Sequence, residues 1–135
     1  MPVISDSPEL WTPPVELRAL ARRDGINLLQ ELVEEFRTDT ASRMQGICRS
    51  LSGGNLIRAR QEAHAVKGSA IQMGAASLVV LSSRLEMAAA TGDRAEAVSL
   101  LETLESEFAR VAHSMSAHCL SLAGDDPPPS PLSVA

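Results

Sequence analysis

The sequence predicts an all-α fold, an antiparallel up-down four-helix bundle with a short additional N-terminal helix across one end. In several long segments, apolar residues recur at spacings of three and four, which is typical of a helix that buries one face. No segment shows the strict alternation of apolar and polar residues that indicates a half-buried strand. Short connections containing glycine join the segments, and such connections place consecutive helices antiparallel.

The first two helices are bounded by capping residues and glycines. The first is predicted to begin at Pro13, with Thr12 as its N-cap, and to end near Arg23. The second is long and is predicted to end at Gly53-Gly54. The residues that repeat along its buried face are Leu29, Val33, Phe36, Thr40, Met44, Ile47 and Leu51.

Three further helices are predicted over residues 55–73, 75–90 and 93–121. Asp93 and Glu96 have the spacing of a capping box at the start of the last helix. These helices, together with the long second helix, supply the four members of the bundle.

The chain is expected to contain one folded domain between two loose ends. Residues 1–11 are predicted to be a flexible N-terminus, residues 12–121 the helical bundle, and residues 122–135 a disordered Pro-rich tail. The three consecutive prolines at positions 127–129 cannot continue a helix.

The composition is that of a globular domain with few aromatic side chains. The chain has 135 residues, 44% hydrophobic and 2% aromatic, and a formal net charge of −5. This combination disfavours nucleic acid and anionic membranes as partners. No apolar run approaches the roughly 20 residues of a membrane-spanning helix, and the N-terminus lacks a signal-peptide pattern. We expect a cytoplasmic protein that is monomeric and uses no cofactor.

The predicted helix over residues 55–73 carries two distinct lines of residues. The line that repeats at spacings of three and four is expected to be buried and consists of Leu56, Ala59, Ala63, Val66, Ala70 and Met73. The other lies roughly 130° around the helix, at about 100° per residue. It is expected to face solvent and consists of Ile57, Arg60, Gln61, His64, Lys67, Gly68 and Ile71. This mixture of apolar, cationic and imidazole side chains is suited to binding a partner protein.

His64 is the candidate reactive residue on this surface. Imidazole groups have an ordinary pKa of about 6.5, so an exposed one keeps a free lone pair near neutral pH and can attack an electrophile. Lys67, one turn further on, is expected to offset the charge of an attached phosphoryl group. Gly68 costs up to about 1 kcal/mol relative to alanine inside a helix, which suggests that another molecule approaches closely here.

The charge of the same helix points to an acidic partner. Residues 55–72 carry three cations, Arg58, Arg60 and Lys67, against one carboxylate, Glu62. A locally cationic helix on an acidic protein favours association with an acidic surface.

These residues belong to a longer motif, His64-Ala65-Val66-Lys67-Gly68-Ser69-Ala70, followed by Gly74-Ala75, Leu78 and Leu85-Glu86. Over about residues 13–120, the pattern resembles the histidine-containing phosphotransfer (HPt) domain of multistep phosphorelays. The resemblance implies that His64 is the phosphoacceptor, Lys67 its charge partner and Gly68 the position that gives clearance. The departures are small: Val66 replaces a more frequent leucine, and Ser82 and Ser83 stand where a small residue or cysteine is common.

The resemblance also implies a stoichiometric phosphocarrier rather than an enzyme. The imidazole of His64, through Nε2, would attack the phosphoaspartate of a receiver domain, which supplies Mg²⁺ and most of the catalysis. The group would then pass to a second receiver. The implied partners are response-regulator receiver domains and a hybrid histidine kinase. Ser69 and Gln72 are weaker candidates for orienting His64 or binding the phosphoryl oxygens. The residues predicted to dock against a receiver are Ile57, Arg60, Gln61, Ile71 and Gln72.

Two other classes of function are compatible with the predicted fold. One is a non-catalytic adaptor that binds or inhibits a receiver or a histidine kinase, with His64 only a contact residue. The other is a helical metalloenzyme, which would need an inward Glu-x-x-His on paired helices, and the sequence has none. Cys48 and Cys119 are expected to be reduced packing residues. His113 and His118 are expected to be exposed to solvent.

Overall fold

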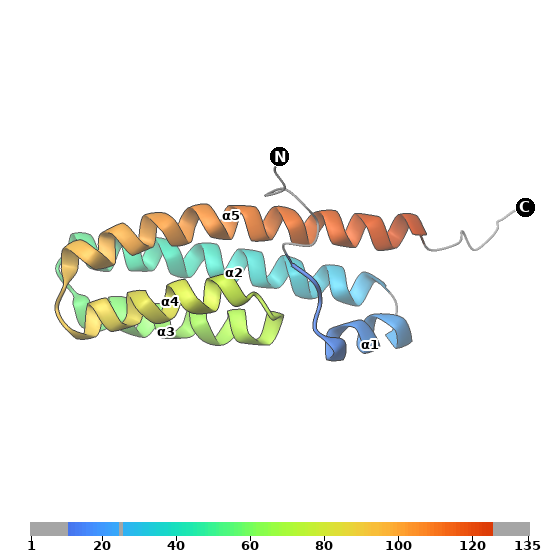
Figure 1. Ribbon diagram of the computed structural model, residues 1–135, viewed down its shortest axis with the longest axis horizontal. Helices are drawn as coiled ribbons and strands as arrows, with labels where there is room; N and C mark the ends of the chain where they lie inside the picture. Colours follow the sequence, from blue (N-terminus) through green and yellow to red (C-terminus); the bar gives the residue numbers. More distant parts are fainter. Residues whose placement is uncertain (1–10, 25, 126–135) are drawn as a thin grey trace, which may run out of the picture.

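The computed structural model describes residues 11–24 and 26–125 and is built from helices (Figure 1). Four of them form a ring in which α2 packs against α3 and α5, and α4 packs against the same two helices. The predicted all-α bundle is confirmed. A short helix, α1, packs against α2 at the end where α2 and α5 extend beyond α3 and α4 (Figure 1). The helices are α1 (Val15–Asp24), α2 (Ile26–Ser52), α3 (Leu56–Met73), α4 (Ala76–Ala90) and α5 (Arg94–Asp125).

The core is aliphatic and rich in alanine, as the composition indicates. On α3, the residues predicted to be buried are buried, except that Leu56 is only half-buried. Three of these residues, Ala59, Ala63 and Ala70, have no exposed surface. Such small side chains let α3 approach α2 and α4 closely, because the distance between packed helices depends on the side chains at the contact.

Trp11 is part of the core, although the sequence placed it in the flexible N-terminus. Its side chain is only 2% exposed. The indole Nε1–H donates to the carbonyl oxygen of Met73 over 2.7 Å, and the backbone N–H donates to Oγ of Ser114 over 3.1 Å. The folded domain therefore begins before the predicted boundary at residue 12. Residues 1–10 lie outside the described part of the chain.

His118 is half-buried rather than exposed, which corrects the sequence prediction. Its ring lies edge-on to Trp11, with the ring centroids 5.7 Å apart. Burial, and to a lesser extent the positive charge of Arg18, lowers the pKa of His118, so the neutral imidazole is favoured. His113 is exposed, as expected.

Two helix boundaries differ from the prediction. α1 begins at Val15 rather than Pro13, because the carbonyl oxygen of Pro14 accepts a hydrogen bond from the N–H of Arg18 over 3.0 Å. α5 continues to Asp125, past the predicted end at residue 121. The helical conformation is disfavoured at a residue that precedes a proline. The first proline after the start of α5 is Pro127. The predicted tail beyond residue 125 lies outside the described residues.

Both ends of α3 are determined by local interactions. At its start, the Asn55 side chain accepts a hydrogen bond from the N–H of Arg58 over 3.0 Å. At its end, Gly74 adopts a left-handed conformation with φ of 69°. A Cβ added to Gly74 would lie 2.8 Å from Cγ of Pro14, so both conformation and space require glycine there.

We expect the Trp11→Ala variant to be strongly destabilised, because it removes a buried indole and leaves a cavity. The free energy of unfolding should fall by about 3–5 kcal/mol. Urea unfolding followed by far-UV circular dichroism measures this loss. Thr12→Ala, at the exposed neighbouring position, should change stability by no more than about 0.5 kcal/mol. Equal stability of the two variants would show that the N-terminal segment does not support the bundle.

Candidate functional site

His64 lies in the middle of α3 and points away from the core. Its side chain is 67% exposed, because the neighbouring residues Ala63 and Val66 occupy the buried side of the helix. Ile57 and Ile71, two turns away on either side, are 69% and 59% exposed. The outward direction expected for His64 from the helical spacing is therefore observed.

The structure adds a residue to this site that the sequence analysis assigned no role. Oε2 of Glu86, on α4, lies 2.9 Å from Nδ1 of His64. Oε1 of the same carboxylate lies 2.9 Å from Nζ of Lys67. One carboxylate thus joins His64 and Lys67 across the interface between α3 and α4.

The environment of Glu86 keeps its carboxylate ionised. Partial burial raises the pKa of Glu86, but hydrogen bonds and charge interactions with Lys67 and His64 outweigh burial, so the pKa lies below its ordinary value. An ionised carboxylate can only accept hydrogen bonds. At the neutral imidazole, Nδ1 therefore carries the proton, and Nε2 keeps a free lone pair toward solvent.

Lys67 is connected to His64 through Glu86. Its side chain is only 25% exposed, and its ammonium group is paired with Glu86. The cation therefore contacts the carboxylate that holds the imidazole, and its role as a counter-charge stays a prediction. The excess of positive charge predicted for α3 is reduced by this pairing with Glu86. Glu62, which that excess already takes into account, pairs with Arg58 over 3.2 Å and with Arg43, on α2, over 3.0 Å.

An open depression of about 310 Å³ lies beside the imidazole and is lined by Arg60, Gln61, His64 and Glu86. Among the described residues, no carboxylate forms an ion pair with Arg60. Arg60 is therefore a cation at the edge of this depression whose charge is available to an incoming anion.

Gly68 lies one turn beyond His64 in open space. A Cβ built at this position meets no atom within 4 Å. Packing within the bundle therefore does not require glycine here. The clearance role for an approaching molecule stays a prediction for this residue, which weakens the helix.

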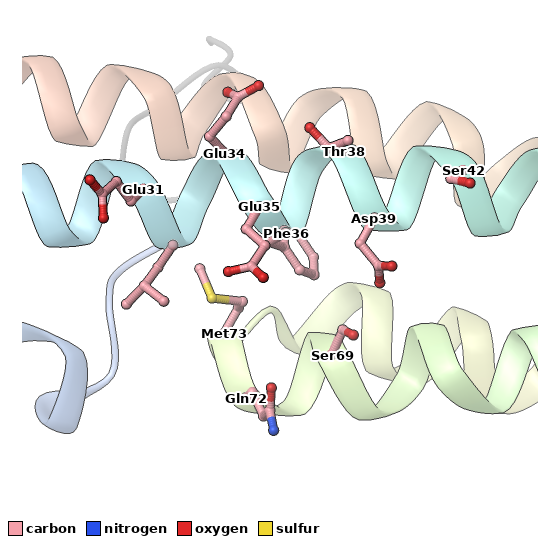
Figure 2. Close-up of a pocket in the computed structure, with 11 residues that line it drawn as sticks. Glu31, Glu34, Glu35, Phe36, Thr38, Asp39, Ser42, Ser69, Gln72 and Met73 are labelled. Carbon is pink, nitrogen blue, oxygen red and sulfur yellow. The ribbon is translucent and has the colours of Figure 1, made fainter.

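The predicted residues Ser69 and Gln72 lie toward the other flank of α3. Together with Met73 they line a larger cavity, of about 970 Å³, between α2 and α3 (Figure 2). Neither residue lines the depression beside His64. This arrangement does not support contact of Ser69 or Gln72 with the imidazole of His64. Gln72 is exposed, and its docking role remains a prediction.

In the described part of the chain, no group of three or more His, Cys, Asp or Glu side chains is arranged to hold a metal ion. No helix among the described residues is long and apolar enough to cross a membrane. Cys119 is buried, as expected for a packing residue, whereas Cys48 is exposed.

Comparison with known proteins identifies the family. The sequence profile of the Hpt domain matches residues 31–114, which include His64 and Glu86. This chain belongs to the Hpt family. Hpt proteins are histidine phosphocarriers that work with receiver domains and kinases in phosphorelays. No curated protein sequence gives a match.

A solved Hpt structure has the same fold. The crystal structure of histidine-containing phosphotransfer protein B (HptB) from Pseudomonas aeruginosa PAO1 superimposes with a TM-score of 0.71 at 26% sequence identity. The alignment covers 81% of this chain and 95% of that chain. The bundle described above is therefore an Hpt bundle over most of its length.

The hydrogen bond from Glu86 should determine which imidazole nitrogen of His64 is protonated. At a pH where the ring is neutral, nitrogen-15 NMR should show a protonated Nδ1 and an unprotonated Nε2 in the parent protein. Glu86→Gln should weaken this preference, because its single amide oxygen cannot accept from both His64 and Lys67 and its NH2 group can donate to Nδ1. Glu86→Leu should give a mixture of tautomers because no acceptor remains. Identical nitrogen shifts in all three proteins would contradict the assigned hydrogen bond.

Proposed function

We propose that His64 accepts a phosphoryl group from the phosphoaspartate of a receiver domain and passes it to another receiver. The observation that carries this proposal is the exposed imidazole whose Nδ1 is held by Glu86, leaving Nε2 free. Membership of the Hpt family supports the reaction class. A hybrid histidine kinase and response regulators are the implied partners.

The step requires no net proton transfer. The lone pair on Nε2 of His64 attacks phosphorus, the Nε2–P bond forms, and the bond between phosphorus and the aspartate oxygen breaks, which releases the aspartate carboxylate. The proton on Nδ1 remains in its hydrogen bond to Glu86, and the carboxylate stabilises the positive charge that develops on the ring. In the reverse direction, the ring leaves as neutral imidazole rather than as an anion.

The charges around His64 suit this exchange. Glu86 alone would repel an incoming phosphoryl group, and its ion pair with Lys67 offsets that negative charge. Arg60, at the edge of the same depression, is placed to attract the phosphoryl oxygens or the acidic groups of a receiver. The proposal leaves the Mg²⁺ ion and most of the stabilisation of the transferred group to the receiver domain. The chain then acts as a stoichiometric carrier.

Incubation with a radiolabelled, phosphorylated receiver should transfer the label to this protein as an acid-labile, alkali-stable phosphoramidate. His64→Gln should abolish labelling while circular dichroism shows unchanged helical content. His113→Gln, which replaces an exposed histidine on a different helix, α5, should be labelled like the parent. A panel of receivers is needed because the cognate partner is not specified by the site. Tight binding of a receiver without transfer of label would instead establish the adaptor function.

Gly68→Ala is expected to have opposite effects on stability and on transfer. In the isolated protein it should raise the free energy of unfolding by about 0.5–1 kcal/mol, because alanine favours the helix and the added methyl group meets nothing. It should also lower the second-order rate constant for phosphorylation, because the methyl group obstructs the docked receiver. Ser106→Ala, at an exposed position on α5, should leave transfer unchanged. A Gly68→Ala protein that is phosphorylated at the parent rate would exclude the clearance role.

A further inference from the structure

Four large apolar side chains on α3 and α4 are strongly exposed, two on the helix that carries His64 and two on its neighbour. Ile57 and Ile71 are 69% and 59% exposed, and Val80 and Met87 on α4 are 56% and 64% exposed. Of these four residues, the sequence analysis assigned docking only to the two isoleucines. Exposed apolar side chains that gather in one area indicate an interaction site.

The antiparallel packing of α3 and α4 determines how these residues are placed. Met87 follows Glu86, which contacts His64, so Met87 lies level with the imidazole along the bundle. Val80 lies seven residues earlier on α4, and Ile71 seven residues later on α3, which is about 10 Å in the same direction along the antiparallel pair. The apolar side chains therefore continue from α3 onto the outer face of α4.

The opposite flank of α3 differs in charge. The cavity between α2 and α3 is lined by four acidic residues, Glu31, Glu34, Glu35 and Asp39 (Figure 2). Glu34 and Asp39 are paired with arginines on α2. Among the described residues, neither Glu31 nor Glu35 has an ion-pair partner. Within the part of the chain that the structure describes, no cation neutralises the negative charge of these two residues.

In the proposed function the receiver carries an aspartyl phosphate and supplies Mg²⁺, which beside a phosphate is usually held by one or two carboxylates. The α2 flank would repel such a surface, because like charges brought together at an interface are unfavourable. On the α4 flank, Arg60 is available, and Arg84 has only a long contact of 4.0 Å to Glu96. Charge and apolar surface therefore favour the same flank.

The geometry points to a receiver-docking surface that spans α3 and α4, with Val80 and Met87 as its second apolar half, and that leaves the cavity between α2 and α3 uncovered. This inference rests on the proposed function, because the occupant is the receiver that exchanges phosphate with His64. An apolar centre that includes Met87, level with His64 along the bundle, together with the cations Arg60 and Arg84, has the composition of a specific protein interface.

The Val80→Ser/Met87→Ser double variant tests the surface without touching the core or the reactive imidazole. Receiver binding is measured by isothermal titration calorimetry, and transfer is measured separately as the rate of labelling over a range of protein concentrations. We expect the dissociation constant to rise about tenfold or more, because two exposed apolar contacts with the receiver are truncated. The labelling rate at saturating concentration should remain unchanged. Val15→Ser/Leu120→Ser, which alters comparably exposed apolar residues on α1 and α5, should bind like the parent.

A second pair of variants tests the acidic flank. Glu31→Gln/Glu35→Gln should leave receiver affinity within about twofold at physiological ionic strength, where exposed charges beyond roughly 8 Å are screened. If Val80→Ser/Met87→Ser binds like the parent, the proposed surface is wrong, whether or not His64 is labelled. If the affinity falls as expected but His64 is never labelled, the surface stands and the phosphotransfer function fails.

Discussion

The packing of small side chains along one side of α3 determines where His64 points. Ala59, Ala63 and Val66 have no exposed surface, and each residue turns the helix by about 100°. A rotation of α3 that buried the imidazole would put a polar ring into an aliphatic core without a hydrogen-bond partner, which is costly. The exposure of the reactive residue is therefore a consequence of core packing, and the contacts of His64 itself need only select its tautomer.

The chemistry of the site belongs to two helices rather than one. α3 supplies His64 and Lys67, but Glu86 on α4 connects them. The carboxylate retains the proton on Nδ1, and the ammonium group offsets the negative charge that this arrangement introduces. A single helix would present an imidazole free to adopt either tautomer. The tertiary contact thus selects the tautomer of an exposed histidine and orients the nitrogen that is proposed to act as the nucleophile.

The two flanks of α3 differ in charge and in exposed apolar surface. Toward α2, Glu31 and Glu35 contribute negative charge that no described cation neutralises. Toward α4, the exposed surface is apolar at Met87 and cationic at Arg60. In the docking arrangement that we propose, an acidic receiver is repelled from one flank and accommodated on the other, so the bundle surface specifies its orientation. The reactive histidine itself carries no such information.

The sequence by itself determined what is local to a helix. Periodicity and capping residues located all five helices, and the spacing along α3 was sufficient to put His64 and Gly68 on its outer side. Only the tertiary structure decided which residues of different helices contact one another. The contact between His64 and Glu86 joins residues 22 apart, and the hydrogen bond from Trp11 to Met73 joins residues 62 apart. Neither follows from local periodicity, because the side of a helix that meets a given neighbour depends on how the whole bundle is assembled.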